Sequence, residues 1–120
     1  MPTKQLDVLV RHQPRAAIID LHGEINAFAE DALNAAYADA ERTDPEVILL
    51  NFSDVEYINS TGIALIVGLL AKARAARRRL LACGLSEHYV EIFNITRLAD
   101  FMTVYLNEQS AMQGVVPKIN

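Results

Sequence analysis

The sequence predicts an α/β fold in which a mixed sheet of four to five strands carries helices mainly on one face. Apolar runs of strand length, at 16–21, 47–52 and 80–83, alternate with helical segments. Strands joined by helices in this way pair in parallel through right-handed crossovers. The first apolar segment, 6–11, is separated from the next one only by residues 12–15, a connection short enough for an antiparallel hairpin.

The first half of the chain contains the predicted hairpin and one helix. Residues 6–11 alternate apolar and polar side chains, as a half-buried strand does, and we expect His22-Gly23-Glu24 to end the second strand. Residues 27–40 have the spacing of an amphipathic helix, whose apolar side includes Phe28 and Tyr37. This helix ends before Pro45, because the residue preceding a proline is disfavoured in helical geometry.

The second half predicts a central strand and a long helix. Residues 47–52 form a nearly continuous apolar run, typical of a strand buried on both faces. We expect a loop at 53–56, followed by a helix that begins at Asn59-Ser60-Thr61 and ends near Arg77. The remaining predicted elements are a strand at 80–83, a helix at 86–94 capped by Ser86, a strand at 102–106 and a short C-terminal helix.

Length and composition indicate one globular domain. The chain has 120 residues, 52% hydrophobic and 22% charged, which is enough for one core. A formal net charge of −4 gives no sign of a nucleic-acid partner. With one cysteine, no signal-like N-terminal apolar segment and no apolar run of membrane-spanning length, the sequence predicts a cytoplasmic protein without direct membrane insertion.

No motif for catalysis, metal binding or cofactor binding is present. His12, His22 and His88 lack the spacing of metal ligands, and the glycines are too isolated to form a phosphate-binding loop. Cys83 has no activating basic neighbour in sequence, so we expect it in the core. We therefore expect that the protein is not an enzyme and holds no metal or cofactor.

Charge is unevenly distributed along the chain. Residues 1–70 have four basic and eleven acidic side chains, whereas residues 71–120 have seven basic and four acidic ones. Most of the basic excess is one cluster of five residues: Lys72, Arg74, Arg77, Arg78 and Arg79. Cations near a helix C-terminus stabilise the macrodipole, which is one interpretation of the cluster. The alternative is a patch that binds phosphate or acidic groups.

The helix that begins near Ser60 has apolar residues on two sides. At about 100° per residue, Ile66, Val67 and Leu70 share a face with Ile63 that can pack on the sheet. Leu65 and Leu69 fall on another side. Either a neighbouring helix covers these two leucines, or they form an exposed apolar patch for a partner protein or a second copy in a homodimer.

Good capping residues gather at the start of this helix. Asn59, Ser60 and Thr61 can each accept a backbone N–H, and Gly62 leaves the backbone uncluttered. One interpretation is capping alone. The other is regulation, because the free N–H groups and the positive end of the helix dipole favour a phosphate on an exposed Ser60 hydroxyl. Phosphorylation would add a charge of about −1.5 to −2 there without breaking the fold.

Three segments of the chain resemble the STAS-domain family of bacterial anti-sigma factor antagonists. They are Leu21-His22-Gly23-Glu24-Ile25-Asn26, Val55-Glu56-Tyr57-Ile58-Asn59-Ser60-Thr61-Gly62-Ile63 and Ile92-Phe93-Asn94-Ile95-Thr96-Arg97-Leu98. Their order and spacing match the family over nearly the whole chain, so the resemblance implies a single STAS domain at 1–120.

The resemblance also implies a switch. In the family, the unphosphorylated antagonist binds a serine-kinase anti-sigma factor and frees the sigma factor. The kinase phosphorylates the residue that corresponds to Ser60, binding is lost, and a PP2C-type phosphatase resets the cycle. On this view Ser60 is the phosphoacceptor, and the partner-binding residues are Asn59, Ser60, Thr61, Gly62, Leu65 and Leu69.

Two residues depart from the family pattern. The Asp that precedes the acceptor serine in the family is Asn59 here, and a glycine of the third segment is Arg97. Asn is nearly isosteric with Asp, so the loop shape is expected to survive while a negative charge is lost. The alternative is a STAS module that is not phosphorylated, acting as a stressosome-type scaffold or an accessory subunit of a membrane transporter. A small-molecule sensor is a third class.

Overall fold

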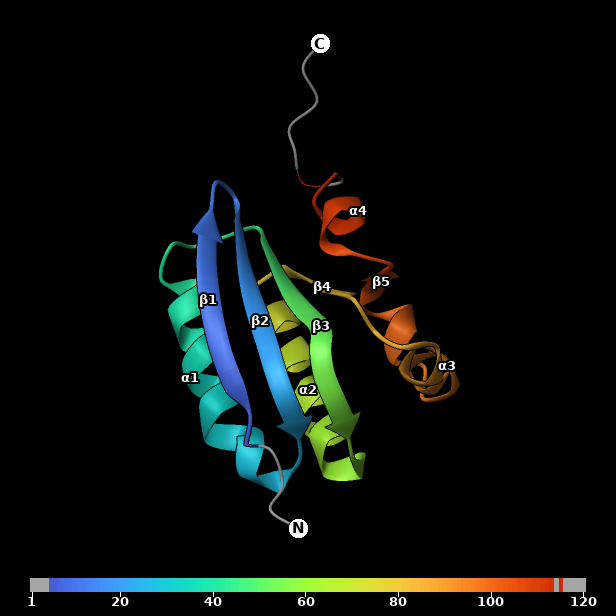
Figure 1. Ribbon diagram of the computed structural model, residues 1–120. Helices are drawn as coiled ribbons and strands as arrows, with labels where there is room; N and C mark the ends of the chain where they lie inside the picture. The colour runs from blue at the N-terminus through green and yellow to red at the C-terminus, as the bar shows by residue number, and fades with distance from the viewer. Residues whose placement is uncertain (1–4, 114, 116–120) are drawn as a thin grey trace.

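The computed structural model describes residues 5–113 and residue 115, and its centre is a five-stranded mixed sheet (Figure 1). The strands lie in the order β1-β2-β3-β4-β5, with only β1 and β2 antiparallel. This confirms the predicted mixed sheet. The strand bounds are β1 (Asp7–Gln13), β2 (Ala16–Ile25), β3 (Val47–Ile58), β4 (Arg79–Cys83) and β5 (Thr103–Tyr105).

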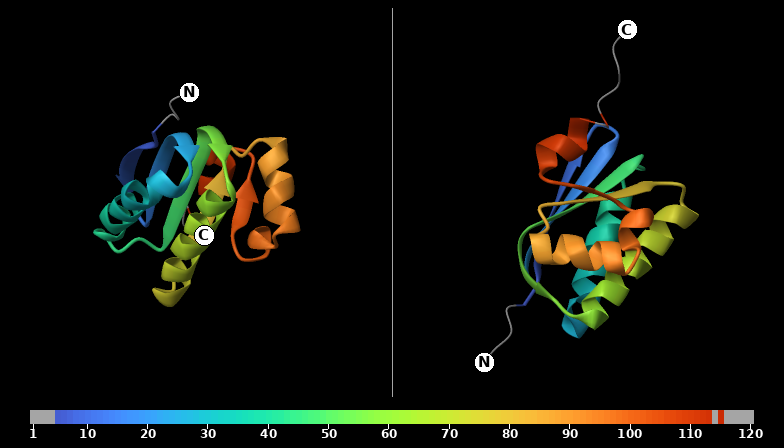
Figure 2. Two further views of the ribbon diagram at one scale, coloured as in Figure 1. Left: turned by 90° about the horizontal axis from the view of Figure 1, so that it is seen from below. Right: turned by 90° about the vertical axis from the view of Figure 1, so that its right-hand side faces the viewer.

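The helices form two layers around the sheet. A 3-10 turn, η1 (Ala27–Ala29), leads into α1 (Glu30–Glu41), which packs beside α2 (Ser60–Ala75) on one face. The helix α3 (Glu87–Ile95) closes the same core and is followed by a second 3-10 turn, η2 (Leu98–Asp100). Figure 2 shows that α4 (Glu108–Gln113) lies on the opposite face from α2.

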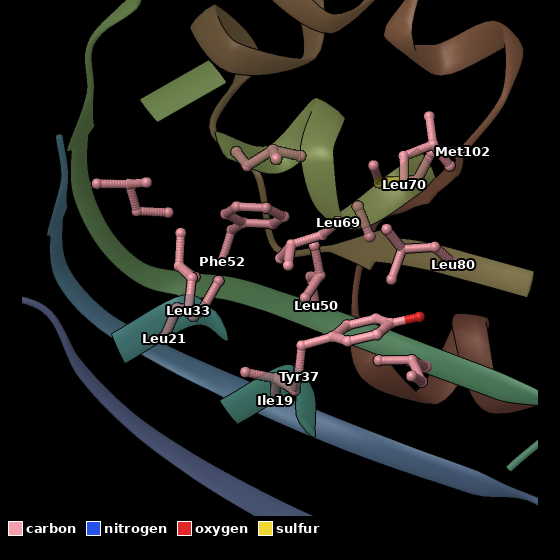
Figure 3. Close-up of a cluster of buried hydrophobic side chains, with 14 of the residues drawn as sticks. Ile19, Leu21, Leu33, Tyr37, Leu50, Phe52, Leu69, Leu70, Leu80 and Met102 are labelled. Carbon is pink, nitrogen blue, oxygen red and sulfur yellow. The ribbon is translucent and has the colours of Figure 1, made fainter. Parts of the chain in front are cut away.

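Alternate residues of the central strand β3 divide the core into two clusters. Ile48, Leu50 and Phe52 point toward α1, α2 and α3, whereas Val47 and Leu49 point toward α4. Figure 3 shows the larger cluster, in which α1 and α2 contribute side chains over β2 and β3. Burial on both faces explains why this strand has a nearly continuous apolar sequence.

Both parallel strands that lead to the Ser60 turn are longer than predicted. His22-Gly23-Glu24 does not end β2, and the expected loop at 53–56 belongs to β3. The two strands stay paired through register shifts between Asp20 and His22 and between Gly23 and Glu24. Gly23 has a φ of 112°, which glycine adopts without a Cβ clash. These irregularities let polar residues continue the strands where the alternation pattern breaks.

The apolar side of α1 also differs from the prediction at one residue. Leu33 and Tyr37 are buried as expected, but Phe28 precedes the helix, in η1, and is 85% exposed. Asn26 starts this 3-10 turn, since its side-chain oxygen accepts the N–H of Phe28 at 2.9 Å. The turn therefore directs Phe28 away from the core.

Arg97 has a backbone conformation that suits the glycine of the family pattern. Its φ is 65°, in the left-handed region that costs a non-glycine residue about 1–2 kcal/mol. Its side chain pairs with Asp100 through an Nε–Oδ2 contact of 2.8 Å. The arginine therefore adopts the left-handed conformation in the turn between α3 and η2.

A charged network ties α4 to the antiparallel hairpin. Arg11 of β1 donates to both carboxylate oxygens of Asp20, at 2.6 and 2.9 Å, and to Glu108 of α4, at 2.6 and 3.1 Å. The Nδ2 group of Asn51 also donates to Asp20, at 2.8 Å. The Arg11 hydrogen bonds hold the pKa of Asp20 below its usual value. Asp20 therefore stabilises the fold in its ionised form.

Replacing Asp20 with Asn should lower the free energy of unfolding at pH 7 by about 1–3 kcal/mol, because it weakens hydrogen bonds to a charged group. The pKa of Asp20 is lower in the folded state, so its contribution is present above the unfolded pKa of about 4. That contribution is lost as the pH falls through the folded pKa. The difference in the free energy of unfolding between the variant and the original protein, measured by urea denaturation, should therefore be smaller at pH 3 than at pH 7.

The matched control is Glu46→Gln, whose partner Arg15 is exposed at the hairpin turn. It removes a similar ion pair outside the network and should change the urea midpoint little. An equally large loss for Asp20→Asn at both pH values would contradict an ionic origin of the stabilisation.

Candidate partner-binding site

Asn59 is the residue that caps α2. It has extended backbone angles, and its side-chain oxygen accepts the N–H of Gly62 at 2.8 Å. Its carbonyl accepts the N–H of Ile63 at 2.9 Å. Three residues were candidate caps from the sequence. In the structure Asn59 is the N-cap, and Ser60 is the first residue of the helix.

Ser60 and Thr61 are both exposed on the first turn of the helix. The hydroxyl of Ser60 makes no hydrogen bond with any residue that the structure describes. The first turn contains no acidic residue, whereas the last turn contains Lys72 and Arg74. The N-terminal end of α2 thus combines an available hydroxyl with unpaired backbone N–H groups and the positive end of the dipole.

The turn before Ser60 is held against the end of β2. The N–H of Asn59 donates to the carbonyl of Ile25 at 3.2 Å. Gly62 is buried, and a Cβ at this position would lie 2.1 Å from the same carbonyl oxygen. Gly62 is therefore required for close approach between α2 and β2, not for an unusual backbone angle. Although it was predicted as a partner-binding residue, its place in the structure is internal.

A second support comes from α3, and sequence reasoning did not find it. The N–H of Ile58 donates to the hydroxyl of Tyr89 at 2.8 Å, and Tyr89 is only 8% exposed. Ser86 caps α3 as predicted and accepts the N–H of Tyr89. Ile58 and Tyr89 are far apart in sequence, so no local pattern indicates their contact. The Ser60 turn is thus held by β2 on one side and α3 on the other.

Two exposed aromatic residues belong to segments at the end of the molecule where β2 and β3 end and α2 begins (Figure 1). Phe28 belongs to η1, which directly follows β2, and is 85% exposed. Tyr57 pairs with Glu24 at the end of the β2–β3 ladder and is 51% exposed. Aromatic residues are enriched where protein interfaces derive most of their affinity. Neither residue was predicted as part of the site.

The same end of the molecule is acidic. The segments 22–34 and 53–71 contain five carboxylates and no Lys or Arg. Two of these carboxylates, Glu30 and Asp31, lie in the first turn of α1, and the others are Glu24, Asp54 and Glu56. A groove of about 710 Å³ is lined by Asp54 and Glu56 together with Asp7 and His22. The surroundings of Ser60 therefore favour a partner surface of positive charge.

Leu69 is not available to a partner, which corrects the prediction for that residue. It is 1% exposed and belongs to the main core, and Leu65 is half-buried against the same core. The neighbouring helix α1 covers this side of α2, as the hydrogen bond from Lys72 to Asn34 at 2.9 Å shows. The exposed side is instead that of Val67, which is 47% exposed and was expected to face the sheet.

Two histidines lie beside carboxylates, and the cysteine lies in the core. His22 pairs with Asp54 at 3.2 Å, and His12 lies 3.5 Å from Asp39. Cys83 is fully buried, and burial raises its pKa to about 11, so it is protonated at neutral pH. Among the residues that the structure describes, no group of three or more His, Cys, Asp or Glu side chains is arranged to hold a metal ion.

The basic cluster divides between two roles. The Nη1 group of Arg78 donates to the carbonyl of Pro45 at 2.6 Å and pairs with Asp44 at 2.9 Å. Lys72 donates a hydrogen bond to Asn34 and so holds α2 to α1, whereas Arg78 holds the segment after α2 to residues 44 and 45. Arg74 differs, because its guanidinium lies over the exposed ring of Phe101 at 5.2 Å from the centroid.

Within the described part of the chain, no helix has the length and apolarity needed to cross a membrane.

Comparison with protein families gives one match over most of the chain. Residues 7–111 match the STAS domain model. An anti-sigma-B factor antagonist of Listeria monocytogenes is 28% identical over 92 residues, covering 77% of this chain and 80% of that protein. The anti-sigma-B factor antagonist of Staphylococcus aureus is 26% identical over 99 residues, covering 82% and 92% respectively.

Solved structures share the fold. The unphosphorylated form of the anti-sigma factor antagonist SpoIIAA has a TM-score of 0.75 at 22% identity, covering 95% of this chain and 100% of that one. Its phosphorylated form, from Bacillus, has a TM-score of 0.71 at 20% identity, covering 92% and 100%. An anti-sigma factor antagonist from Mycobacterium paratuberculosis has a TM-score of 0.75 at 20% identity, covering 92% and 94%.

Substituting Gly62 with Ala should destabilise the fold by about 1–3 kcal/mol, the usual effect of overpacking. The new methyl would meet the Ile25 carbonyl, which lies in backbone that cannot rotate away. Gly68→Ala on the same helix is the matched control. Nothing lies within 4 Å of its added Cβ, so it should stabilise the protein by about 0.5–1 kcal/mol through helix propensity. Chemical denaturation of both variants measures the difference, and equal effects would contradict the close approach.

Proposed function

We propose that this chain, which belongs to the STAS domain family, is an anti-sigma factor antagonist whose binding to a serine-kinase anti-sigma factor ends when Ser60 is phosphorylated. Its action is binding and not catalysis, since ATP and metal belong to the kinase. A PP2C-type phosphatase restores the unphosphorylated form. The relatives named anti-sigma-B factor antagonist support this proposal.

The observation that carries the proposal is the division of roles between Asn59 and Ser60. Because Asn59 accepts the N–H of Gly62, the Ser60 hydroxyl is not needed to start the helix. It is exposed and can be modified without loss of the cap. A phosphate there would meet the free N–H groups of the first turn, which stabilise an anion. SpoIIAA, a protein of the same fold, exists in both phosphorylated and unphosphorylated forms.

Asn59 in place of the family's Asp is compatible with this role. Either side chain offers an oxygen to the N–H of Gly62, so the geometry of the turn does not depend on a negative charge. Negative charge near the site is supplied by the carboxylates of the β2 and β3 ends and of the first turn of α1. A basic partner surface would therefore still be attracted to this end.

The position of Ser60 within the proposed contact explains how a phosphate would end binding. A partner surface that fits Phe28 and Tyr57 must also come close to the first turn of α2, where Ser60 and Thr61 are exposed. A phosphate would add bulk and about −1.5 to −2 charge at the centre of that contact. Although a basic partner surface would attract that charge, the added bulk and the cost of removing the phosphate's hydration would oppose a contact that fits the free hydroxyl. The partner-binding residues that we propose are Asn59, Ser60, Thr61, Phe28 and Tyr57. The exposed part of the half-buried Leu65 completes the set.

Incubation of the protein with its cognate histidine-kinase-like ATPase and ATP should place one phosphate on Ser60. Mass spectrometry of proteolytic peptides locates it. Ser60→Ala should abolish the modification, whereas Thr61→Ala, the control, should retain it because the neighbouring hydroxyl is not the acceptor. Binding of the kinase without any phosphate on Ser60 would overturn the proposed switch and favour the scaffold or transporter-subunit alternative.

Ser60→Asp should weaken kinase binding by at least about tenfold, which corresponds to about 1.4 kcal/mol. The melting temperature should hardly change, because an acid in the first turn of a helix is favourable. Ala38→Asp is the control, since it adds the same charge at an exposed position on α1. Calorimetric titration gives the affinity and differential scanning fluorimetry the stability. A large loss of stability with unchanged affinity would show that the serine acts in folding alone.

A further inference from the structure

The C-terminal half of α2 and the η2 turn form an apolar groove that the proposed switch does not use. It is lined by Val67, Leu70, Ala71, Arg74 and Phe101, with a volume of about 240 Å³. Val67 is 47% and Phe101 57% exposed, although both are large apolar side chains. Exposed apolar residues that are contiguous in this way are typical of interaction surfaces.

The groove has a basic rim. It continues into a second depression of about 170 Å³ that is lined by Arg74, Arg78 and Arg79 together with Leu80 and Phe101. Arg78 is committed to the chain segment at Pro45, with its side chain only 13% exposed. Arg74 and Arg79 are exposed, and neither has an ion-pair partner among the residues that the structure describes. These two guanidinium groups are therefore available to carboxylates from outside.

The surface of α2 beside the groove is formed by residues with small side chains. Gly68 has open space around it, with no heavy atom within 4 Å of an added Cβ, and Ala71 is exposed. Small residues on a helix allow another helix to approach its backbone closely, so that larger side chains of the second helix fill the groove. The stacked pair of Arg74 and Phe101 forms one wall, and it presents an apolar ring and a cation together.

We propose that this groove binds an acidic amphipathic helix of a partner protein, with apolar residues over Val67 and Phe101 and carboxylates at Arg74 and Arg79. Apolar burial supplies affinity and the arginines select the sign of the partner's charge. Arg74 lies 14 residues after Ser60 on the same helix, which is about 20 Å along the axis. That distance exceeds the Debye length of about 8 Å at physiological salt, so binding in the groove is independent of a charge at Ser60.

The probe is a fluorescein-labelled helical peptide with Leu on one face and Glu on the other, titrated by fluorescence anisotropy. It should bind, and a peptide with Lys for Glu should not. Arg74→Glu and Val67→Asp should each weaken binding by at least about tenfold, as the loss of a central interface contact does. Lys72→Glu is the matched control: it reverses a charge in the same turn on the α1 side, and binding should change by less than about twofold.

Amide chemical shifts of the unmodified protein, followed by NMR as the Glu peptide is added, give a second measurement that does not depend on the folding of the variants. They should change at 67–74 and at 98–103 and stay constant at 58–62. Ser60→Asp should leave the peptide affinity unchanged, so failure of the switch and failure of the groove can be told apart. Equal binding of the Glu and Lys peptides, shifts centred on the Ser60 turn, or no saturable binding would each overturn the proposal.

Discussion

The candidate site depends on the contact between the end of β2 and the start of α2. One carbonyl, that of Ile25, accepts the N–H of Asn59 and packs against the Cα of Gly62. Because any side chain at residue 62 would push the two elements apart, this contact sets the position of the helix on the sheet. Tyr89 secures the same turn from α3 through Ile58. Ser60 is therefore displayed by a rigid support, as binding on a small scaffold requires.

The charge distribution gives α2 two different ends. Its first turn lies among the carboxylates of the β2 and β3 ends, whereas its last turn and the following residues are basic. Carboxylates near the N-terminus of a helix and cations near its C-terminus are both favourable to the helix dipole. The uneven charge along the sequence is thus a separation in space, and opposite ends of one helix suit partner surfaces of opposite charge.

The periodic patterns of the sequence were sufficient to predict a mixed sheet with an antiparallel first hairpin and the approximate helices, but not the rotation of α2. Apolar residues occur on several sides of this helix, so its sequence fits more than one buried face. Packing against α1 buries Leu69 and leaves Val67 exposed. The Tyr89 contact with Ile58 depends on tertiary structure, and the exposure of Phe28 depends on where a 3-10 turn gives way to α-helix. Neither leaves a local signal.

The neutral cap Asn59 would have a consequence for the proposed phosphorylation of Ser60. With Asp at residue 59, a phosphate on Ser60 would face a carboxylate in the adjacent residue. At about 5 Å in a solvent of dielectric constant near 80, two unit charges repel by about 0.8 kcal/mol. Asn59 keeps the hydrogen bond to Gly62 without that repulsion. If Ser60 is phosphorylated as proposed, the helix N-terminus would stabilise the phosphate as its first negative charge, so Asn59 in place of Asp would favour the modified form.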